Sequence, residues 1–172
     1  MVTINWNKSG IFALTSITAK VPLALSFRWV DEPFKYLGIC LTPDKTELIT
    51  ANYGRVLTQL ADSIDRWIRL LLTLLGRISI MKMIIMPMLL YFFLNIPVPP
   101  PRPFFIRLRT LLLKLAWAGG ASRLTWSLIT LSLHQGGLAA PDPELYYFCV
   151  QAHFAAYWLH TPPYMAHMAP EH

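Results

Sequence analysis

The chain has 172 residues, of which 55% are hydrophobic and 14% charged, and its formal net charge is +6. The length suits one domain, and the apolar composition favours a membrane protein or a piece of a larger core over an ordinary soluble domain. Two isolated cysteines, Cys40 and Cys149, exclude a disulfide framework, and residues 1–8 lack the apolar core of a signal peptide. We therefore expect an intracellular protein, cytoplasmic or nuclear.

The positive charge is concentrated in one part of the chain. No acidic residue lies between Asp65 and Asp142. The basic residues of this stretch are Arg66, Arg69, Arg77, Lys82, Arg102, Arg107, Arg109, Lys114 and Arg123. A stretch of one sign attracts polyanions, which are either nucleic-acid phosphates or an anionic membrane surface.

Residues 1–45 predict short strands, because β-branched and aromatic residues alternate there with prolines and glycines. From Glu47 the period changes to three and four, which predicts an amphipathic helix ending near Leu71 with Trp67 on its core face. Asp62 and Asp65 lie on this helix, four residues before Arg66 and Arg69 respectively. That spacing predicts ion pairs on a solvated face rather than a metal site.

A second helix is expected over residues 77–96, apolar on nearly all sides and therefore buried on most of them. Pro87 should kink this helix. Residues 97–103 are mostly proline, which predicts a stiff, non-helical polyproline connector that also resembles an SH3 ligand. The uncharged run 83–96 is shorter than the roughly 20 residues of a spanning helix, so a buried core helix is favoured over a membrane span.

Helical spacing resumes over residues 104–117, with Phe104, Leu108, Leu111 and Leu115 on one side. Arg107 and Lys114 are seven residues apart and should share another face. Residues 122–133 fit a helix or a strand equally well, and a turn is expected at residues 135–137.

A last helix should begin after Asp142, because an Asp cap followed by Pro143 and Glu144 is typical of a helix start. We expect Tyr147, Val150, Phe154 and Tyr157 to point inward from it. Residues 161–172 are expected to be disordered. His153, His160 and His167 recur every seven residues, but nothing completes a zinc site, so no metal site is expected.

Several short motifs occur in an order that resembles reverse transcriptases of LINE-type (non-LTR) retrotransposons. Ile4-Asn5-Trp6-Asn7-Lys8-Ser9 comes first, and Phe34-Lys35-Tyr36-Leu37-Gly38-Ile39 follows. Gly76-Arg77-Ile78 with Lys82 lies about forty residues on, and the last are Gly136-Gly137-Leu138, Pro141-Asp142 and Tyr146-Tyr147. The resemblance covers residues 4–160. Residues 118–122 are less basic than in that family.

The resemblance implies a division into the end of a palm with a primer-grip-like hairpin (1–45), thumb-like helices (46–118), a post-thumb segment with a helix (119–160) and a tail (161–172). It implies an α+β fold with short N-terminal antiparallel strands followed by a mainly helical, thumb-like bundle. The nucleic-acid-binding residues that it implies are Lys8, Lys35, Tyr36, Leu37, Gly38, Arg77, Lys82, Arg107 and Lys114.

The catalytic aspartates that bind magnesium in this family would lie before Met1, so the resemblance implies no catalytic residue and no cofactor within this chain. We therefore expect an inactive fragment of an RNA-directed DNA polymerase that retains binding of the RNA/DNA template–primer duplex and whose polymerase portion lies upstream. Two alternatives stay open, a membrane-associated basic helical protein and a translated relic without a selected role.

Overall fold

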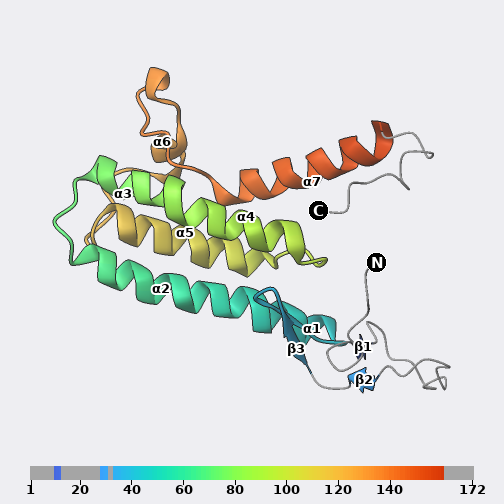
Figure 1. Cartoon of the computed structure of the whole chain (residues 1–172). Coiled ribbons are helices and arrows are strands. Elements are labelled where there is room, and N and C mark those ends of the chain that lie inside the picture. Colours follow the sequence, from blue (N-terminus) through green and yellow to red (C-terminus); the bar gives the residue numbers. More distant parts are fainter. Residues whose placement is uncertain (1–9, 13–27, 31–32, 161–172) are drawn as a thin grey trace, which may run out of the picture. The chain divides into compact units, whose positions relative to one another are not determined.

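A computed structural model of the chain describes residues 10–12, 28–30 and 33–160. It has an α+β fold in which short strands precede a series of helices (Figure 1). The chain forms two compact units, residues 1–59 and residues 60–172. Lys8 and the tail 161–172, for which the sequence made predictions, lie outside the described residues.

Two strand pairs occur in the described part of the first unit. Strands β3 (Phe34–Tyr36) and β4 (Ile39–Leu41) form an antiparallel hairpin, as the sequence predicted. Strands β1 (Gly10–Phe12) and β2 (Arg28–Val30) pair in parallel, so the antiparallel prediction is wrong for them. Parallel strands need a long connection, which residues 13–27 supply.

The first long helix is a continuous run of three segments, α1 (Lys45–Ile49), the π-helical turn η2 (Thr50–Gly54) and α2 (Arg55–Ile68). It begins at Asp44, whose side chain accepts a hydrogen bond from the Glu47 amide. The helix was predicted, and the π-helical turn was not. Trp67 is half-buried rather than part of the buried core, so its predicted core position is wrong.

In the second unit, α3 (Leu74–Ile80), the π-helical turn η3 (Met81–Ile85) and α4 (Met86–Asn95) form another continuous run. Pro87 lies at the start of α4, directly after the π-helical turn, where the Met86 amide donates to the Met81 carbonyl five residues earlier. The altered hydrogen bonding of this turn lets the helix continue past a residue that lacks an N–H donor.

Helix α5 (Arg102–Ala116) lies beside α3 and α4 (Figure 1). Its first turn contains Pro103, so the predicted connector ends at Pro101 rather than at residue 103. Proline is tolerated there because the first helical amides have no intrahelical acceptor. Leu108, Leu112 and Leu115 of α5 are fully buried, whereas Leu111, predicted on the same face, is half-buried.

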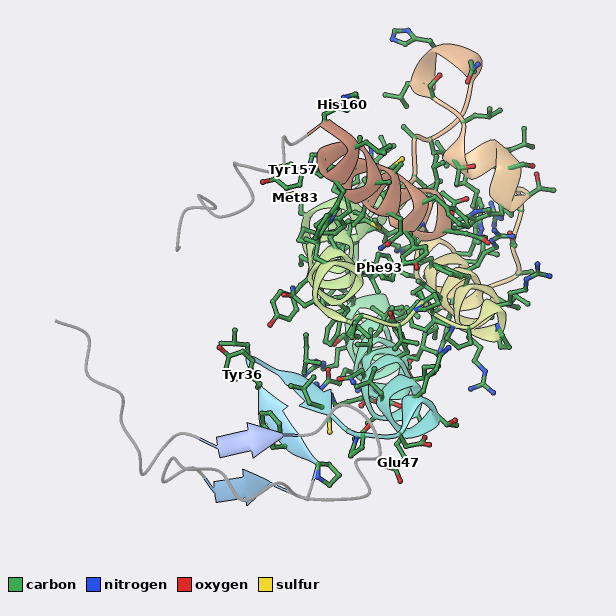
Figure 2. All side chains as sticks on the ribbon, turned by 90° about the vertical axis from the view of Figure 1, so that its right-hand side faces the viewer. Tyr36, Glu47, Met83, Phe93, Tyr157 and His160 are labelled. Atoms are coloured by element: carbon green, nitrogen blue, oxygen red, sulfur yellow. The ribbon has the colours of Figure 1, made fainter. Side chains whose placement is uncertain are left out.

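An aromatic cluster joins three helices of the second unit. The Phe93 ring of α4 contacts Phe104 and Phe105 of α5 and Tyr147 of α7 (Pro143–His160), with ring centroids 6.4, 6.2 and 5.3 Å away respectively. Figure 2 shows Phe93 among these helices and Met83 at the periphery. Met83 is 76% exposed, and Ile84 and Leu94 are also exposed. The prediction that residues 77–96 are buried on most sides is therefore wrong.

Between α5 and α7 lie the short helices α6 (Trp126–Thr130) and η4 (Leu133–Gln135). Helix α7 begins after Asp142, as predicted, and the Asp142 carboxylate accepts a hydrogen bond from the Glu144 amide. Tyr147 and Val150 are half-buried, but Phe154 and Tyr157 are exposed, which contradicts their predicted inward position. Only the first part of α7 packs against α4 within the described unit.

Candidate nucleic-acid interface

The tip of the β3–β4 hairpin is a two-residue turn, Leu37-Gly38. Their φ angles are 46° and 87°, the two positive values that a type I′ hairpin turn requires. Glycine adopts such a φ freely, whereas a leucine there costs about 1 to 2 kcal/mol. Leu37 is 71% exposed and Tyr36 61% exposed, and Figure 2 places Tyr36 at the outer edge of the hairpin. A strained, apolar tip of this kind is a reasonable contact surface for a ligand.

Two side chains of the following helix hold this hairpin. Asn52, in the π-helical turn, is 0% exposed; its Oδ1 accepts from the Cys40 amide and its Nδ2 donates to the Cys40 carbonyl, both at 2.8 Å. The same Nδ2 also donates to the Leu48 carbonyl at 2.8 Å. One turn on, Arg55 donates from Nη2 to the carbonyl of Gly38 at the tip. The helix thus fixes both the base and the tip of the hairpin.

In the second unit most basic side chains have no carboxylate partner. Between described residues, ion pairs join Lys114 to Asp65 (Nζ to Oδ1, 2.5 Å) and Arg109 to Glu144 (Nη2 to Oε2, 3.4 Å). Asp65 therefore pairs with Lys114 of α5, and the predicted pairing of Asp65 with Arg69 is wrong. Arg69, Lys82, Arg102, Arg107 and Arg123 have no acidic partner among the described residues.

Arg77 caps the C-terminal end of α5. Its Nη1 donates to the Ala116 carbonyl at 3.1 Å, one of the carbonyls that the helix itself leaves without a partner. The side chain is half-buried. Lys114 lies in the last turn of the same helix. The structure therefore brings Arg77 and Lys114 to one end of α5, and Arg107 lies about two turns away on the exposed side of that helix.

A pocket of about 470 Å³ opens at this end of α5, lined by Leu74, Arg77, Ala116, Trp117, Gly120, Ala121 and Arg123. Two of its residues carry buried N–H groups without a hydrogen-bond partner, the Nε of Arg77 and the Nε1 of Trp117. A buried donor left without a partner costs about 1 to 3 kcal/mol. No acidic residue lines this pocket.

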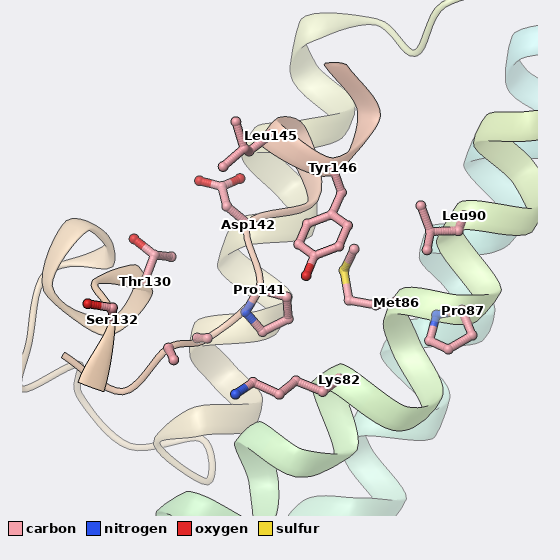
Figure 3. Close-up of a pocket in the computed structure, with 12 residues that line it drawn as sticks. Lys82, Met86, Pro87, Leu90, Thr130, Ser132, Pro141, Asp142, Leu145 and Tyr146 are labelled. Atoms are coloured by element: carbon pink, nitrogen blue, oxygen red, sulfur yellow. The ribbon is translucent and has the colours of Figure 1, made fainter. Parts of the chain in front are cut away.

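Lys82 lines a different pocket, of about 580 Å³, between the η3–α4 region and the segment that leads into α7. Figure 3 shows its side chain extending toward the segment that holds Pro141, with Met86 and Tyr146 farther along the pocket. Arg77 and Lys82 therefore serve two separate pockets, in keeping with the five-residue spacing that prevents them from sharing one helix face.

The start of α7 is held against α5 and α6 by a polar cluster. Asp142 accepts a hydrogen bond from the Trp126 indole (Nε1 to Oδ2, 3.0 Å), and the Arg109 guanidinium lies 5.5 Å from the centre of the Trp126 ring. Arg109 also forms an ion pair with Glu144, so its contacts are with other residues of the fold. Arg109 was not among the predicted binding residues.

In the described ranges no group of three or more His, Cys, Asp or Glu side chains is arranged to hold a metal ion. No model of a known protein family matches the chain. Each unit thus holds its own candidate contact surface, the hairpin residues Lys35–Gly38 in the first and the exposed basic side chains without acidic partners in the described part of the second.

Asn52, Arg55, Trp117 and Arg123 were not among the predicted binding residues. Asn52 is an isolated polar residue in an amphipathic stretch, and only the fold shows that its amide faces Cys40. Trp117 and Arg123 follow the end of α5 and lie near Arg77 because residues 117–123 form a loop with left-handed backbone at Ala118 and Gly119. The lone Trp at the end of a basic helix was the one available signal.

Proposed function

We propose that the chain is the primer-grip and thumb portion of a LINE-type reverse transcriptase, and that it binds the RNA/DNA template–primer duplex. The hairpin Lys35–Gly38 supplies an apolar, strained tip, and the helices of the second unit supply positive charge. Binding through phosphates is independent of base sequence, which is what a polymerase thumb needs.

One observation carries the proposal. Arg69, Lys82, Arg102, Arg107 and Arg123 belong to one unit and have no carboxylate partner within its described part. An arginine that serves only the fold usually pairs with a carboxylate or a carbonyl, as Arg109 and Arg77 do here. Exposed cations without such partners are available to phosphates, and a duplex supplies one phosphate charge for about every 1.7 Å of its axis.

Binding to a membrane is the second candidate, because the run Leu74–Asn95 is long and apolar enough to span one. The most apolar stretch of 18 residues in this run has a mean hydropathy of 1.8, and 39% of that stretch is buried. Its exposed apolar residues include Leu75, Met83, Ile84, Tyr91 and Leu94. Lys82 and the start of α4 at Pro87 argue against a span, since a charge and a proline lie within it.

The deciding experiment compares two polyanions at several salt concentrations. The chain is titrated into a fluorescent RNA/DNA duplex, and separately mixed with vesicles that contain an anionic phospholipid. The proposal expects duplex binding with a steep, linear dependence of log affinity on log salt and no preference among duplex sequences. Co-sedimentation with vesicles in salt that abolishes duplex binding, together with extraction by detergent alone, would favour the membrane candidate.

A further inference from the structure

We propose that the pocket at the C-terminal end of α5 is a binding site for a phosphate group. Arg77, Trp117, Gly120 and Arg123 are among the residues that line it. The phosphate belongs either to a nucleic-acid backbone or to free inorganic phosphate. The first source rests on the proposed function, and the second does not.

The charge of the pocket favours an anion. Two guanidinium groups line it, and no carboxylate does. Arg123 is exposed and has no acidic partner among the described residues. The guanidinium presents several N–H donors in a planar fork that matches phosphate oxygens, and this makes arginine the usual residue for such sites.

The unused donors favour a ligand that accepts hydrogen bonds. Of the three buried side-chain nitrogens without a partner in the described chain, two belong to residues of this pocket, Arg77 and Trp117. Native proteins leave few such groups, and a bound ion is one of the usual reasons for those that occur. An indole N–H can donate only, so its partner must be an acceptor.

The fold keeps part of the pocket in place before a ligand arrives. Arg77 is held by its hydrogen bond to the Ala116 carbonyl, which leaves its Nε without a partner. The backbone beyond α5 is fixed by hydrogen bonds from the Gly119 amide to the Lys114 carbonyl (2.8 Å) and from the Gly120 amide to the Trp117 carbonyl (2.9 Å). A Cβ at Gly120 would lie 3.2 Å from that Trp117 carbonyl oxygen, so a side chain would crowd the floor of the site.

The test uses the full chain and a matched pair of variants. Arg123→Gln removes one charge from the pocket, and Arg66→Gln removes one from the exposed surface of α2, outside the pocket and outside the proposed duplex-binding set. Trp117→Phe keeps an aromatic ring and deletes the N–H. Circular dichroism establishes that each variant is folded. Inorganic phosphate at constant ionic strength is titrated by calorimetry, and an RNA/DNA duplex by fluorescence anisotropy.

We expect Arg123→Gln to weaken binding by about tenfold, the cost of one charge-assisted hydrogen bond, while Arg66→Gln changes it by less than about twofold. Trp117→Phe should weaken binding by about threefold or more. If only the pocket variants lose affinity for inorganic phosphate, the site binds free phosphate. If they lose affinity for the duplex alone, the site binds a phosphate of the nucleic-acid backbone.

The result that overturns the inference is an equal loss of affinity in Arg123→Gln and Arg66→Gln, or no loss in either, with both ligands. If both variants still bind duplex as the unmodified chain does, the proposed function stands and the pocket is not a phosphate site. If the unmodified chain binds inorganic phosphate but no duplex, and Arg123→Gln abolishes that phosphate binding, the pocket stands and the proposed function is overturned.

Discussion

Asn52 and Cys40 are joined by two hydrogen bonds, one in each direction and each 2.8 Å long. The amide group of a single side chain thus pairs with the backbone of strand β4 as a neighbouring strand would. Because Asn52 lies in the π-helical turn η2, this contact ties the hairpin that carries Tyr36 and Leu37 to the helix behind it.

Asn52→Ala should destabilise the first unit by about 2 to 4 kcal/mol, because it leaves the N–H and C=O of the half-buried Cys40 without partners. The measurement is amide hydrogen exchange at Cys40, with urea unfolding of the whole chain. Asn95→Ala is the control, since the side chain of the exposed Asn95 donates to the Tyr91 carbonyl four residues earlier and its removal should cost within about 0.5 kcal/mol. Unchanged exchange at Cys40 in Asn52→Ala would contradict this role.

Leu37→Asn should stabilise the hairpin by about 1 kcal/mol, because asparagine tolerates the positive φ that strains leucine. If the exposed tip contacts the duplex, the same substitution should lower duplex affinity by removing an apolar contact. Urea unfolding and duplex titration on one sample measure both effects. A more stable variant with unchanged affinity would show that the Leu37 side chain is no part of the interface.

Lys114→Ala and Asp65→Asn should act in opposite directions on duplex binding, because the two side chains form an ion pair in which both are about half exposed. Asp65→Asn frees the lysine and should raise affinity. The double variant Arg107→Ala/Lys114→Ala should lower it and should flatten the log–log salt slope by about 0.9 for each phosphate interaction that it removes, on B-form DNA. If slope and affinity are unaltered in a folded variant, Arg107 and Lys114 lie outside the interface.

Tyr147→Phe should remove part of the decrease in stability at high pH. Burial in the aromatic cluster raises the pKa of the Tyr147 phenol above its ordinary value of 10.0. Above pH 10 the unfolded chain therefore holds fewer protons than the folded chain, and stability falls as pH rises toward the folded pKa. Urea midpoints from pH 8 to 11 should drop less steeply in the variant, whereas Tyr157→Phe, at an exposed position on the same helix, should follow the unmodified chain.

We also expect no RNA-directed nucleotide incorporation by this chain with magnesium or manganese. The 172 residues contain no Asp-Asp pair, and two-metal polymerisation in the proposed family needs such carboxylates. Primer extension on an RNA template measures this, with an active reverse transcriptase as the positive control. Incorporation that persists after contaminating polymerases are removed would contradict the expectation.

Local signals in the sequence predicted most helices and the short strands, and the resemblance predicted the hairpin. Asp142 and Pro143 predicted the start of α7, and the apolar spacing after Glu47 predicted the first long helix. The signals failed where a contact depends on distant residues. Lys114 was placed on its helix face by spacing alone, but its partner Asp65 lies 49 residues away in the sequence.

Burial along the apolar helices was the least predictable property. An apolar period states which side chains avoid water, and it does not state whether a neighbouring helix is there to cover them. Met83 and Tyr157 both belong to such patterns and both are exposed, since α7 packs against α4 only through its first part. Composition pointed to a membrane protein or a piece of a larger core, and these two residues belong to a broader set of exposed apolar side chains.

At the two π-helical turns, the number of residues should matter more to the fold than their identity. Such a turn contains one residue more than regular α-helical winding would use. Deleting a single residue within Thr50–Gly54 would restore regular winding and keep the helix, but it would change the angle between Asn52 and Arg55 around the helix axis. Substitutions in this turn other than at Asn52 should therefore be tolerated more readily than the deletion of one codon, because the deletion moves the anchors at Asn52 and Arg55 away from the strand and the tip that they hold.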